Sequence, residues 1–151
     1  MFDGNAPNIW AIPIALGYVG PFDAGYIAGA LAAVTVAIIT FRRGASPHLA
    51  LLSAMLLPFL LPKMHERYFF LADLLSFSIA WAMRSRASIW TCGFIQAASV
   101  ASMVAYMGPM PWLNGIASVA MAAALWLLCL SIASYRDEQA ARGLRASSFR
   151  S

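Results

Sequence analysis

Residues 113–135 read LNGIASVAMAAALWLLCLSIASY and contain no charged side chain. A helix needs about 20 consecutive, mostly apolar residues to cross the hydrocarbon core of a bilayer, so this run predicts a transmembrane helix. The whole chain has the same character, because 62% of its 151 residues are apolar and only 11% are charged. A soluble domain carries roughly 25% charged residues, and one of this size has too little interior to bury so much apolar surface. The sequence therefore predicts an integral membrane protein and excludes soluble enzymes, disordered chains and disulfide-linked secreted domains.

Other apolar segments precede this run, and together they predict an all-α, polytopic bundle of about five transmembrane helices. The second segment is short and contains Pro58, which is typical of a tilted, broken or partly inserted helix. Ile9–Val19 is also apolar, but Pro13 and Gly17 interrupt it, so residues 1–21 are expected to form an outer loop or an interfacial segment. The five expected spans are Phe22–Phe41, Leu49–Leu61, Tyr68–Met83, Ile89–Met107 and Leu113–Tyr135.

The distribution of basic residues predicts the orientation of these spans. All Lys and Arg residues except Lys63 and Arg67 lie in residues 42–48, in residues 84–87 or in the tail from Arg136. The positive-inside rule then places the N-terminus outside and residues 136–151 in the cytoplasm as a basic tail of a multi-pass protein of the cell (inner or plasma) membrane. The net charge of +4 forms no basic stripe, so nucleic acid is not an expected partner.

The two exceptions belong to the densest polar cluster in the sequence, which lies between the second and third spans. Lys63, His65, Glu66 and Arg67 place four ionisable side chains within five positions on the outer side. If Met64 and the residues after it are helical, the basic side chains lie near a helix N-terminus, where unpaired N–H groups favour anions. Arg grips two phosphate oxygens, Lys acts as a point charge and His donates a hydrogen bond, while Glu66 orients a basic group or accepts from a sugar hydroxyl.

A second interpretation of the same cluster involves no ligand. Basic residues at a helix end commonly anchor the helix to lipid headgroups, and Tyr68 then belongs to the aromatic belt. Asp73 lies deeper, within the third span, where an ionisable group needs a partner or water. It either lines a polar cavity that runs down from the cluster or forms a hydrogen bond with a serine or a neighbouring helix.

Other polar and small residues have local interpretations. Asn5 and Asn8 lie on the outer side with Asp3 and Trp10, where they form a lid or a sugar-binding loop over the cluster. Alternatively, residues 3–5, DGN, simply form a turn. Gly25, Gly29 and Ala33 form a small-xxx-small ridge that predicts close helix packing. The cysteines, Cys92 and Cys129, lie in apolar runs without a CxxC pattern or a neighbouring histidine, so no metal site is expected.

The residues of the cluster carry a family resemblance. The stretch Leu61–Asp73, LPKMHERYFFLAD, resembles the late P-K-M-H-E-R-Y motif of bacterial multi-spanning GT-C glycosyltransferases, a branch similar to the mannosyltransferases of the GPI-anchor pathway. Asn5–Trp10, NAPNIW, is similar to a second block found upstream of that motif in the same proteins. The resemblance covers residues 5 to about 81, and the remaining spans match by hydropathy alone.

The resemblance implies transfer of a sugar from a polyprenyl-phosphate donor to an acceptor on the non-cytoplasmic side, with inversion, an acidic general base and no cofactor. It places Lys63, His65, Glu66 and Arg67 at the lipid phosphate, with Asn5, Asn8, Tyr68 and Asp73 as possible site-lining residues. Those enzymes have about twice as many spans, and their catalytic Asp lies in a first outer loop that Asp3 does not match. The chain therefore resembles the C-terminal half of such an enzyme, which implies that it lacks the general base and leaves its catalytic residues unknown. The resemblance implies a truncated product or fragment, inactive alone, or a subunit whose partner chain supplies the N-terminal half.

Two other functions remain open. In the first alternative, the chain is a small non-enzymatic membrane protein, such as a transporter subunit with a proton or ion path along His65, Glu66 and Asp73. In the second alternative, the chain is a helix-packing partner of another membrane protein. Its function would then tolerate alanine at His65, Glu66 and Arg67 together.

Overall fold

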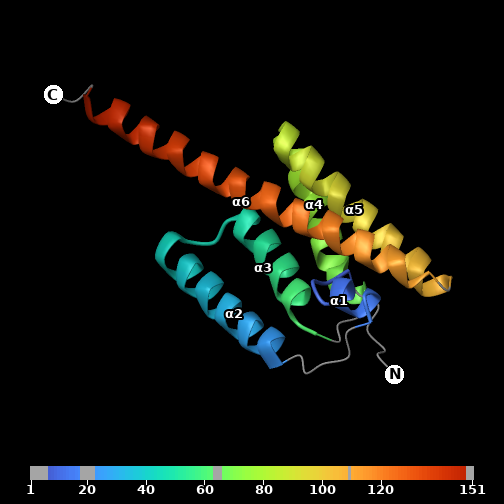
Figure 1. Cartoon of the computed structure of the whole chain (residues 1–151). Helices are drawn as coiled ribbons and strands as arrows, with labels where there is room; N and C mark the ends of the chain where they lie inside the picture. Colours follow the sequence, from blue (N-terminus) through green and yellow to red (C-terminus); the bar gives the residue numbers. More distant parts are fainter. Residues whose placement is uncertain (1–6, 18–22, 63–65, 109, 149–151) are drawn as a thin grey trace.

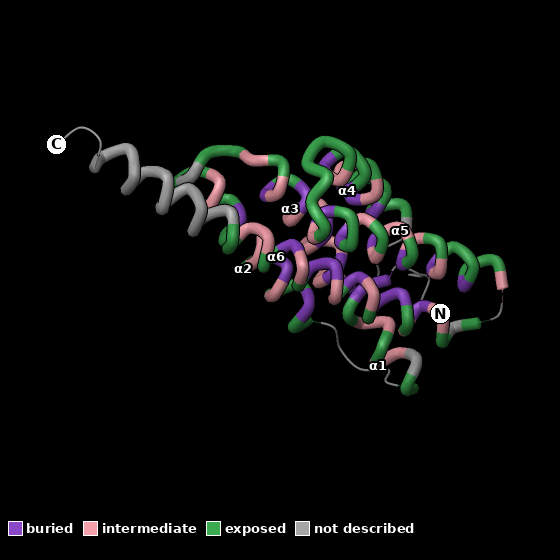
Figure 2. The backbone as a smooth tube through the Cα atoms, turned by 90° about the horizontal axis from the view of Figure 1, so that it is seen from above, coloured by how far each residue is buried: buried purple, intermediate pink, exposed green. Residues whose placement is uncertain are grey.

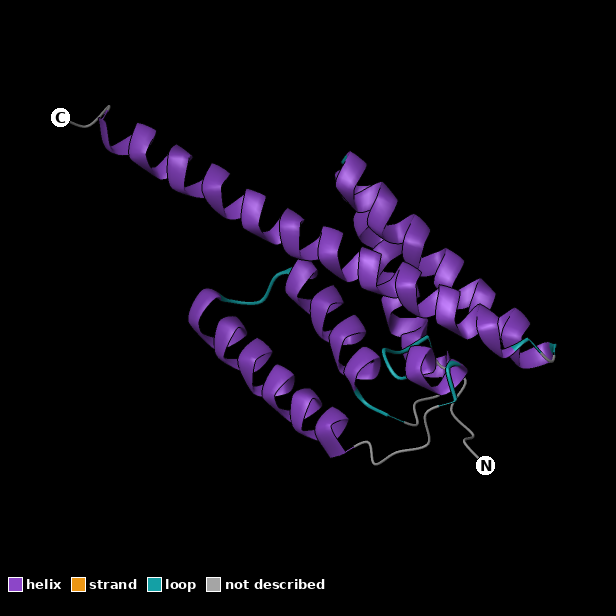
Figure 3. Cartoon of the chain, in the orientation of Figure 1, coloured by secondary structure: helices purple, strands orange, loops and turns teal. Residues whose placement is uncertain are grey.

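The computed structural model describes residues 7–17, 23–62, 66–108 and 110–148, and within them it contains helices and connections but no strand. The all-α prediction is confirmed (Figure 3). In chain order the elements are α1 (Ala11–Ala15), α2 (Asp23–Arg43), α3 (Pro47–Leu60), the 3-10 helix η1 (Glu66–Phe69), α4 (Phe70–Met83), α5 (Arg86–Met107) and α6 (Pro111–Ser148).

Local signals set several of the helix ends. Ser46 precedes α3 and accepts a hydrogen bond from the Leu49 amide at 3.2 Å, and Ser85 caps α5 in the same way by accepting from the Ser88 amide at 3.1 Å. Arg84 ends α4 in the left-handed conformation, with φ of 50°. Pro58 lies inside α3 without breaking it, although its ring removes one backbone donor from the helix.

The helices α2 to α6 run back and forth, so that successive connections lie at opposite ends of the bundle (Figure 1). One end carries the α2–α3 and α4–α5 connections, and the other carries α1, the end of α3, η1, the end of α5 and the start of α6. We refer to them as the 44–46 end and the 61–69 end. The α5 and α6 helices pack along each other and against α3 or α4, whereas α2 lies at the side and contacts α3 alone among the described helices.

A single apolar core lies between α3, α4, α5 and α6. Its side chains are fully or almost fully buried, and the faces that meet there are visible in Figure 2. Small residues on α5 and α6 let the two backbones approach closely around a few larger side chains. The core includes Leu51, Met55, Phe59, Phe69, Ala72, Ile95, Ala98, Ala117, Met121, Ala124 and Leu128.

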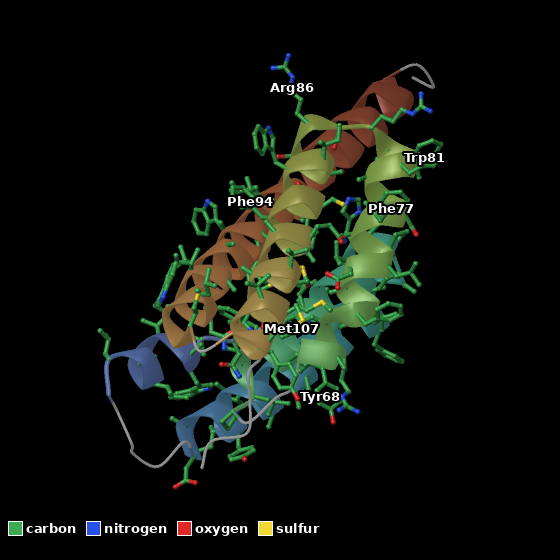
Figure 4. The ribbon with its side chains drawn as sticks, turned by 90° about the vertical axis from the view of Figure 1, so that its right-hand side faces the viewer. Tyr68, Phe77, Trp81, Arg86, Phe94 and Met107 are labelled. Atoms are coloured by element: carbon green, nitrogen blue, oxygen red, sulfur yellow. The ribbon has the colours of Figure 1, made fainter. Side chains whose placement is uncertain are left out.

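Large apolar side chains also cover the outside of the molecule. On α2, Ile27, Leu31 and Val34 are each more than half exposed, and Phe41 is 92% exposed. Exposed aromatic residues mark both ends: Tyr68 lies at the 61–69 end, and Trp81 lies near the 44–46 end (Figure 4). Such a surface is stable in contact with lipid tails, with aromatic side chains near the two interfaces.

Three helices are long and apolar enough to cross a membrane, namely Asp23–Arg42, Arg86–Met107 and Trp112–Ser134. The chain is therefore a membrane protein. The α3 and α4 helices have 14 residues each, which corresponds to about 21 Å at the rise of an α-helix, less than the ~30 Å of a bilayer core. The structure thus supports three of the five expected spans by length.

The last helix is longer than the sequence pattern indicated. The apolar run ends at Tyr135, but α6 continues to Ser148 and includes the segment expected to be a separate tail. Residues 138–142, EQAAR, are good helix formers, and Glu138 precedes Arg142 by one turn. Apolar periodicity therefore marks the end of the span and not the end of the helix.

Candidate functional site

The N-terminal segment is hydrogen-bonded to the C-terminal end of α3. The last carbonyl groups of any helix lack partners within the helix, and here three consecutive residues, 59–61, find theirs in residues 8–10. Ile9 and Phe59 join through their backbones, whereas Asn8 and Trp10 use side chains. The three bonds run from Ile9 N to Phe59 O at 3.0 Å, from Trp10 Nε1 to Leu60 O at 2.7 Å and from Asn8 Nδ2 to Leu61 O at 3.2 Å.

Asn8 is the centre of this junction and is only 4% exposed. Its Oδ1 atom accepts hydrogen bonds from the Trp10 and Ala11 amides at 3.1 and 3.2 Å, an arrangement that also begins α1. Its backbone carbonyl accepts a bond of 2.7 Å from the Ser118 hydroxyl on α6. Asn8 thus joins the N-terminal segment, the end of α3 and the start of α6. The turn expected at residues 3–5 lies outside the described residues.

Two glycines let α2 approach this junction. A Cβ atom on Gly25 would lie 2.7 Å from Cζ2 of Trp10 and 2.9 Å from Cδ of Pro62. A Cβ atom on Gly29 would lie 2.7 Å from Cδ2 of Leu61. The predicted close packing of this ridge is confirmed at both glycines, and the surface it packs against is the α3 end together with Trp10.

The polar cluster begins directly after the junction. Lys63 and His65 lie outside the described residues, as does Asn5, and Glu66 is described only as the first residue of η1. Arg67 is exposed and Tyr68 is 52% exposed, whereas Phe69 is 1% exposed and belongs to the core. Over residues 66–69 the expected helix is therefore a 3-10 turn that buries Phe69 and leaves Arg67 accessible at the end of the bundle.

Asp73 lies one turn into α4 and faces α5. Its Oδ1 atom accepts a hydrogen bond of 2.7 Å from Ser99 Oγ, and its backbone carbonyl accepts from Gln96 Nε2 at 3.1 Å and from Ser76 Oγ at 2.9 Å. Of the two alternatives for this residue, the structure shows the hydrogen-bonded aspartate that links two helices. Among the described residues, no three His, Cys, Asp or Glu side chains gather as a metal site would require.

We expect Ser99→Ala to lower the free energy of unfolding by about 1 kcal/mol, because the half-buried Asp73 carboxyl loses its donor. In a chain of this length that corresponds to roughly 2–4 °C in the thermal midpoint, measured on the detergent-solubilised protein by circular dichroism. Ser78→Ala is the matched control, since Ser78 is exposed on the same helix pair and bonds only the Leu74 carbonyl of its own helix. Equal midpoints for the two variants would contradict a stabilising role for the Asp73–Ser99 bond.

No protein-family model, curated protein or solved structure matches the chain.

Proposed function

We propose that this chain recognises the phosphate of a polyprenyl-phosphate-linked sugar at its 61–69 end, as the later half of a GT-C glycosyltransferase does. The observation that carries the proposal is the contact between the two blocks of the resemblance. Asn8 and Trp10 of the first block donate hydrogen bonds to the carbonyls of Leu61 and Leu60, where the second block begins. Blocks that are about 50 residues apart in sequence are therefore neighbours at one end of the bundle.

The flanks of the cluster support a role in binding. Pro62 is buried on one side of Lys63–Arg67 and Phe69 is buried on the other. Both flanking residues are thus part of the packed bundle, and they lie directly before and shortly after the cluster in the sequence.

An apolar groove at the same end suits the isoprenoid chain of such a donor. It has a volume of about 360 Å³ between α1 and α6, and Ile12, Leu16, Trp112 and Ile116 contribute to its walls. Ligand pockets for apolar molecules have this size and lining. In the proposal the phosphate lies at the cluster and part of the polyprenyl chain lies along this groove.

The proposed topology has five crossings, with the N-terminus outside and the C-terminus in the cytoplasm. Arg42, Arg84 and Arg86 lie at the 44–46 end, as the positive-inside rule requires for a cytoplasmic face. The short α3 and α4 helices cross by local thinning of the bilayer or end below the headgroups. The cluster then lies near the depth of lipid phosphates in the outer leaflet.

In this proposal the basic side chains stabilise the charge that develops on the leaving lipid phosphate. The general base comes from another polypeptide segment or from a second membrane chain, because no residue here matches the catalytic acid of the family. Glycosyl transfer by this chain is therefore expected only together with that partner.

We expect Arg67→Gln to weaken binding of a polyprenyl phosphate about tenfold, because a charge-assisted contact to phosphate contributes on the order of 1.4 kcal/mol or more. Binding is measured with radiolabelled polyprenyl phosphate on the full chain in lipid nanodiscs. Arg42→Gln removes the same charge at the 44–46 end and serves as the control. Unchanged binding in Arg67→Gln, or an equal loss in both variants, would leave Arg67 as a headgroup anchor and overturn the proposal.

A further inference from the structure

A small void lies between four helices near the 44–46 end of the bundle, away from the polar cluster. Each helix contributes two residues that are three positions apart, so the wall is one helical turn deep. The void is separate from the 61–69 end and from the function proposed for it. Its lining residues are His48 and Leu51 from α3, Ser76 and Ile79 from α4, Ser88 and Thr91 from α5, and Leu128 and Ser131 from α6.

The hydroxyl of Thr91 is the feature that points to a ligand. Thr91 is 3% exposed, and its Oγ1 atom has no hydrogen-bond partner among the described residues. An unpaired buried hydroxyl costs free energy, and a threonine in a helix commonly avoids this cost by bonding the carbonyl four residues earlier. Thr35 on α2 does so, because its hydroxyl donates to the Leu31 carbonyl at 2.7 Å. Thr91 instead lines the void with its donor unused.

Two serines of the same wall supply hydrogen-bond acceptors. Ser76 Oγ donates to the Asp73 carbonyl at 2.9 Å. Ser131 Oγ donates to the Leu127 carbonyl at the same distance. Each serine has thus used its one donor, but a hydroxyl oxygen also has two acceptor lone pairs. The wall therefore suits a ligand that donates two hydrogen bonds and accepts one.

The size and charge of the void limit this ligand to a small neutral molecule. The volume of about 10 Å³ corresponds to about one water molecule. Leu51, Ile79 and Leu128 form the apolar part of the wall and are buried. Among the described residues that line the void none is acidic, so a cation would lack a charged ligand. Water has the required two donors and an acceptor, and it carries no charge.

Water has a short route to the void from the 44–46 end. A pocket of about 440 Å³ lies at that end and shares His48, Ser88 and Ser131 with the void, so the two are adjacent. Thr91 lies five residues after the start of α5 at Arg86, which is about 8 Å along the helix. Figure 4 shows Arg86 at this end of the molecule.

We propose that the void binds one ordered water molecule, which accepts a hydrogen bond from Thr91 Oγ1 and donates to the hydroxyl oxygens of Ser76 and Ser131. Three hydrogen bonds are typical of a buried water. The water joins α4, α5 and α6 at one level of the bundle, and it gives the Thr91 hydroxyl the partner that its own helix does not supply.

Thr91→Val tests the proposal by the sign of its effect, because valine has nearly the same shape but no hydroxyl. The water loses its donor, so the thermal midpoint of the full chain in detergent is expected to fall by about 2–4 °C. In a dry void the same variant would remove an unpaired hydroxyl and raise the midpoint. Thr35→Val is the matched control on an exposed helix face. An unchanged or raised midpoint in Thr91→Val, relative to this control, would overturn the proposal.

A double-mutant cycle tests whether Thr91 and Ser131 bond the same water. Once one change has displaced the water, the other loses less, so Thr91→Val with Ser131→Ala is expected to lower the midpoint by about 2 °C less than the sum of the single effects. Ser134→Ala is the matched control and should add to Thr91→Val. Ser134 and Ser131 each bond the carbonyl four residues earlier on α6, but Ser134 lies outside the void. Additive effects in both cycles would contradict a shared water.

A high-resolution crystal structure of the full chain, grown in a lipid mesophase, provides the direct test. Density for a water oxygen is expected about 2.7–2.8 Å from Thr91 Oγ1. A dry void, or a Thr91 hydroxyl that donates to the Ala87 carbonyl four residues earlier, would overturn the assignment.

Discussion

Replacing Asn8 with alanine is expected to lower the free energy of unfolding by about 3 kcal/mol, because three hydrogen bonds are lost at a nearly buried site. The Leu61 carbonyl loses its side-chain donor, and the Trp10 and Ala11 amides lose their acceptor. A loss of this size corresponds to roughly 6–12 °C in the thermal midpoint of a chain of this length. Binding of polyprenyl phosphate should weaken as well, since Leu61 precedes the cluster directly.

The measurement is thermal unfolding in detergent, followed by tryptophan fluorescence, with two companion variants. Asn8→Asp keeps the oxygen that accepts from the amides but loses the Nδ2 donor, so an intermediate effect is expected. Asn114→Ala is the control, because Asn114 is also buried but its Oδ1 has no partner among the described residues. If Asn8→Ala were no more destabilising than Asn114→Ala, the junction would not stabilise the bundle.

Gly25→Leu is expected to have an effect of comparable size, because the first side-chain atom already overlaps with its neighbours. The Cβ atom would meet Trp10 at 2.7 Å and Pro62 at 2.9 Å, and both of these are held by the junction. Overpacking of this kind destabilises by about 1–3 kcal/mol or more. Since α2 contacts only α3 among the described helices, we expect α2 to separate from the bundle.

Separation of α2 is detected by limited proteolysis at the 44–46 connection, which should be cut faster in the variant, together with the thermal midpoint. Gly93→Leu is the matched control on α5, where an added Cβ atom meets nothing within 4 Å. Its expected effect is neutral or slightly stabilising, because leucine favours helix more than glycine does. Similar cleavage rates for the two variants would show that Gly25 is not required for close packing.

The membrane class and the helical segments could be predicted because they follow from length and hydrophobicity alone. The segment expected at Phe22–Phe41 is α2, Asp23–Arg43, and that expected at Ile89–Met107 is α5, Arg86–Met107. The Gly25–Gly29 ridge was also recognisable, since small residues four apart permit close approach whatever the neighbour is. The surface that the ridge packs against, the end of α3 together with Trp10, could not be predicted, because that contact joins residues far apart in the chain.

The candidate sites were predicted less completely. Asp73 had two interpretations, a cavity-lining group or a hydrogen-bonded one, which differ in whether a donor faces the carboxyl group. The sequence could not decide between them, because the donor, Ser99, lies on another helix. A pocket of about 440 Å³ at the 44–46 end was not predicted, because its serines come from the cap and first turn of α5 and from α6, and they resemble ordinary small residues of a membrane helix. Pairs of serines three residues apart, 85 with 88 and 131 with 134, are the only local sign of it.

By itself the sequence determined that the chain is a helical membrane protein, because burial of apolar side chains in lipid and backbone hydrogen bonding within helices are local properties. The tertiary structure alone decided what Asn8 and Asp73 do, because the Leu61 carbonyl and the Ser118 hydroxyl that bond Asn8, and the Ser99 hydroxyl that bonds Asp73, come from distant segments. In the bundle, the carbonyls at the end of α3 are satisfied by residues some 50 positions earlier. Such hydrogen bonds depend on which helix ends meet in space, and hydropathy along the chain does not predict which ends meet.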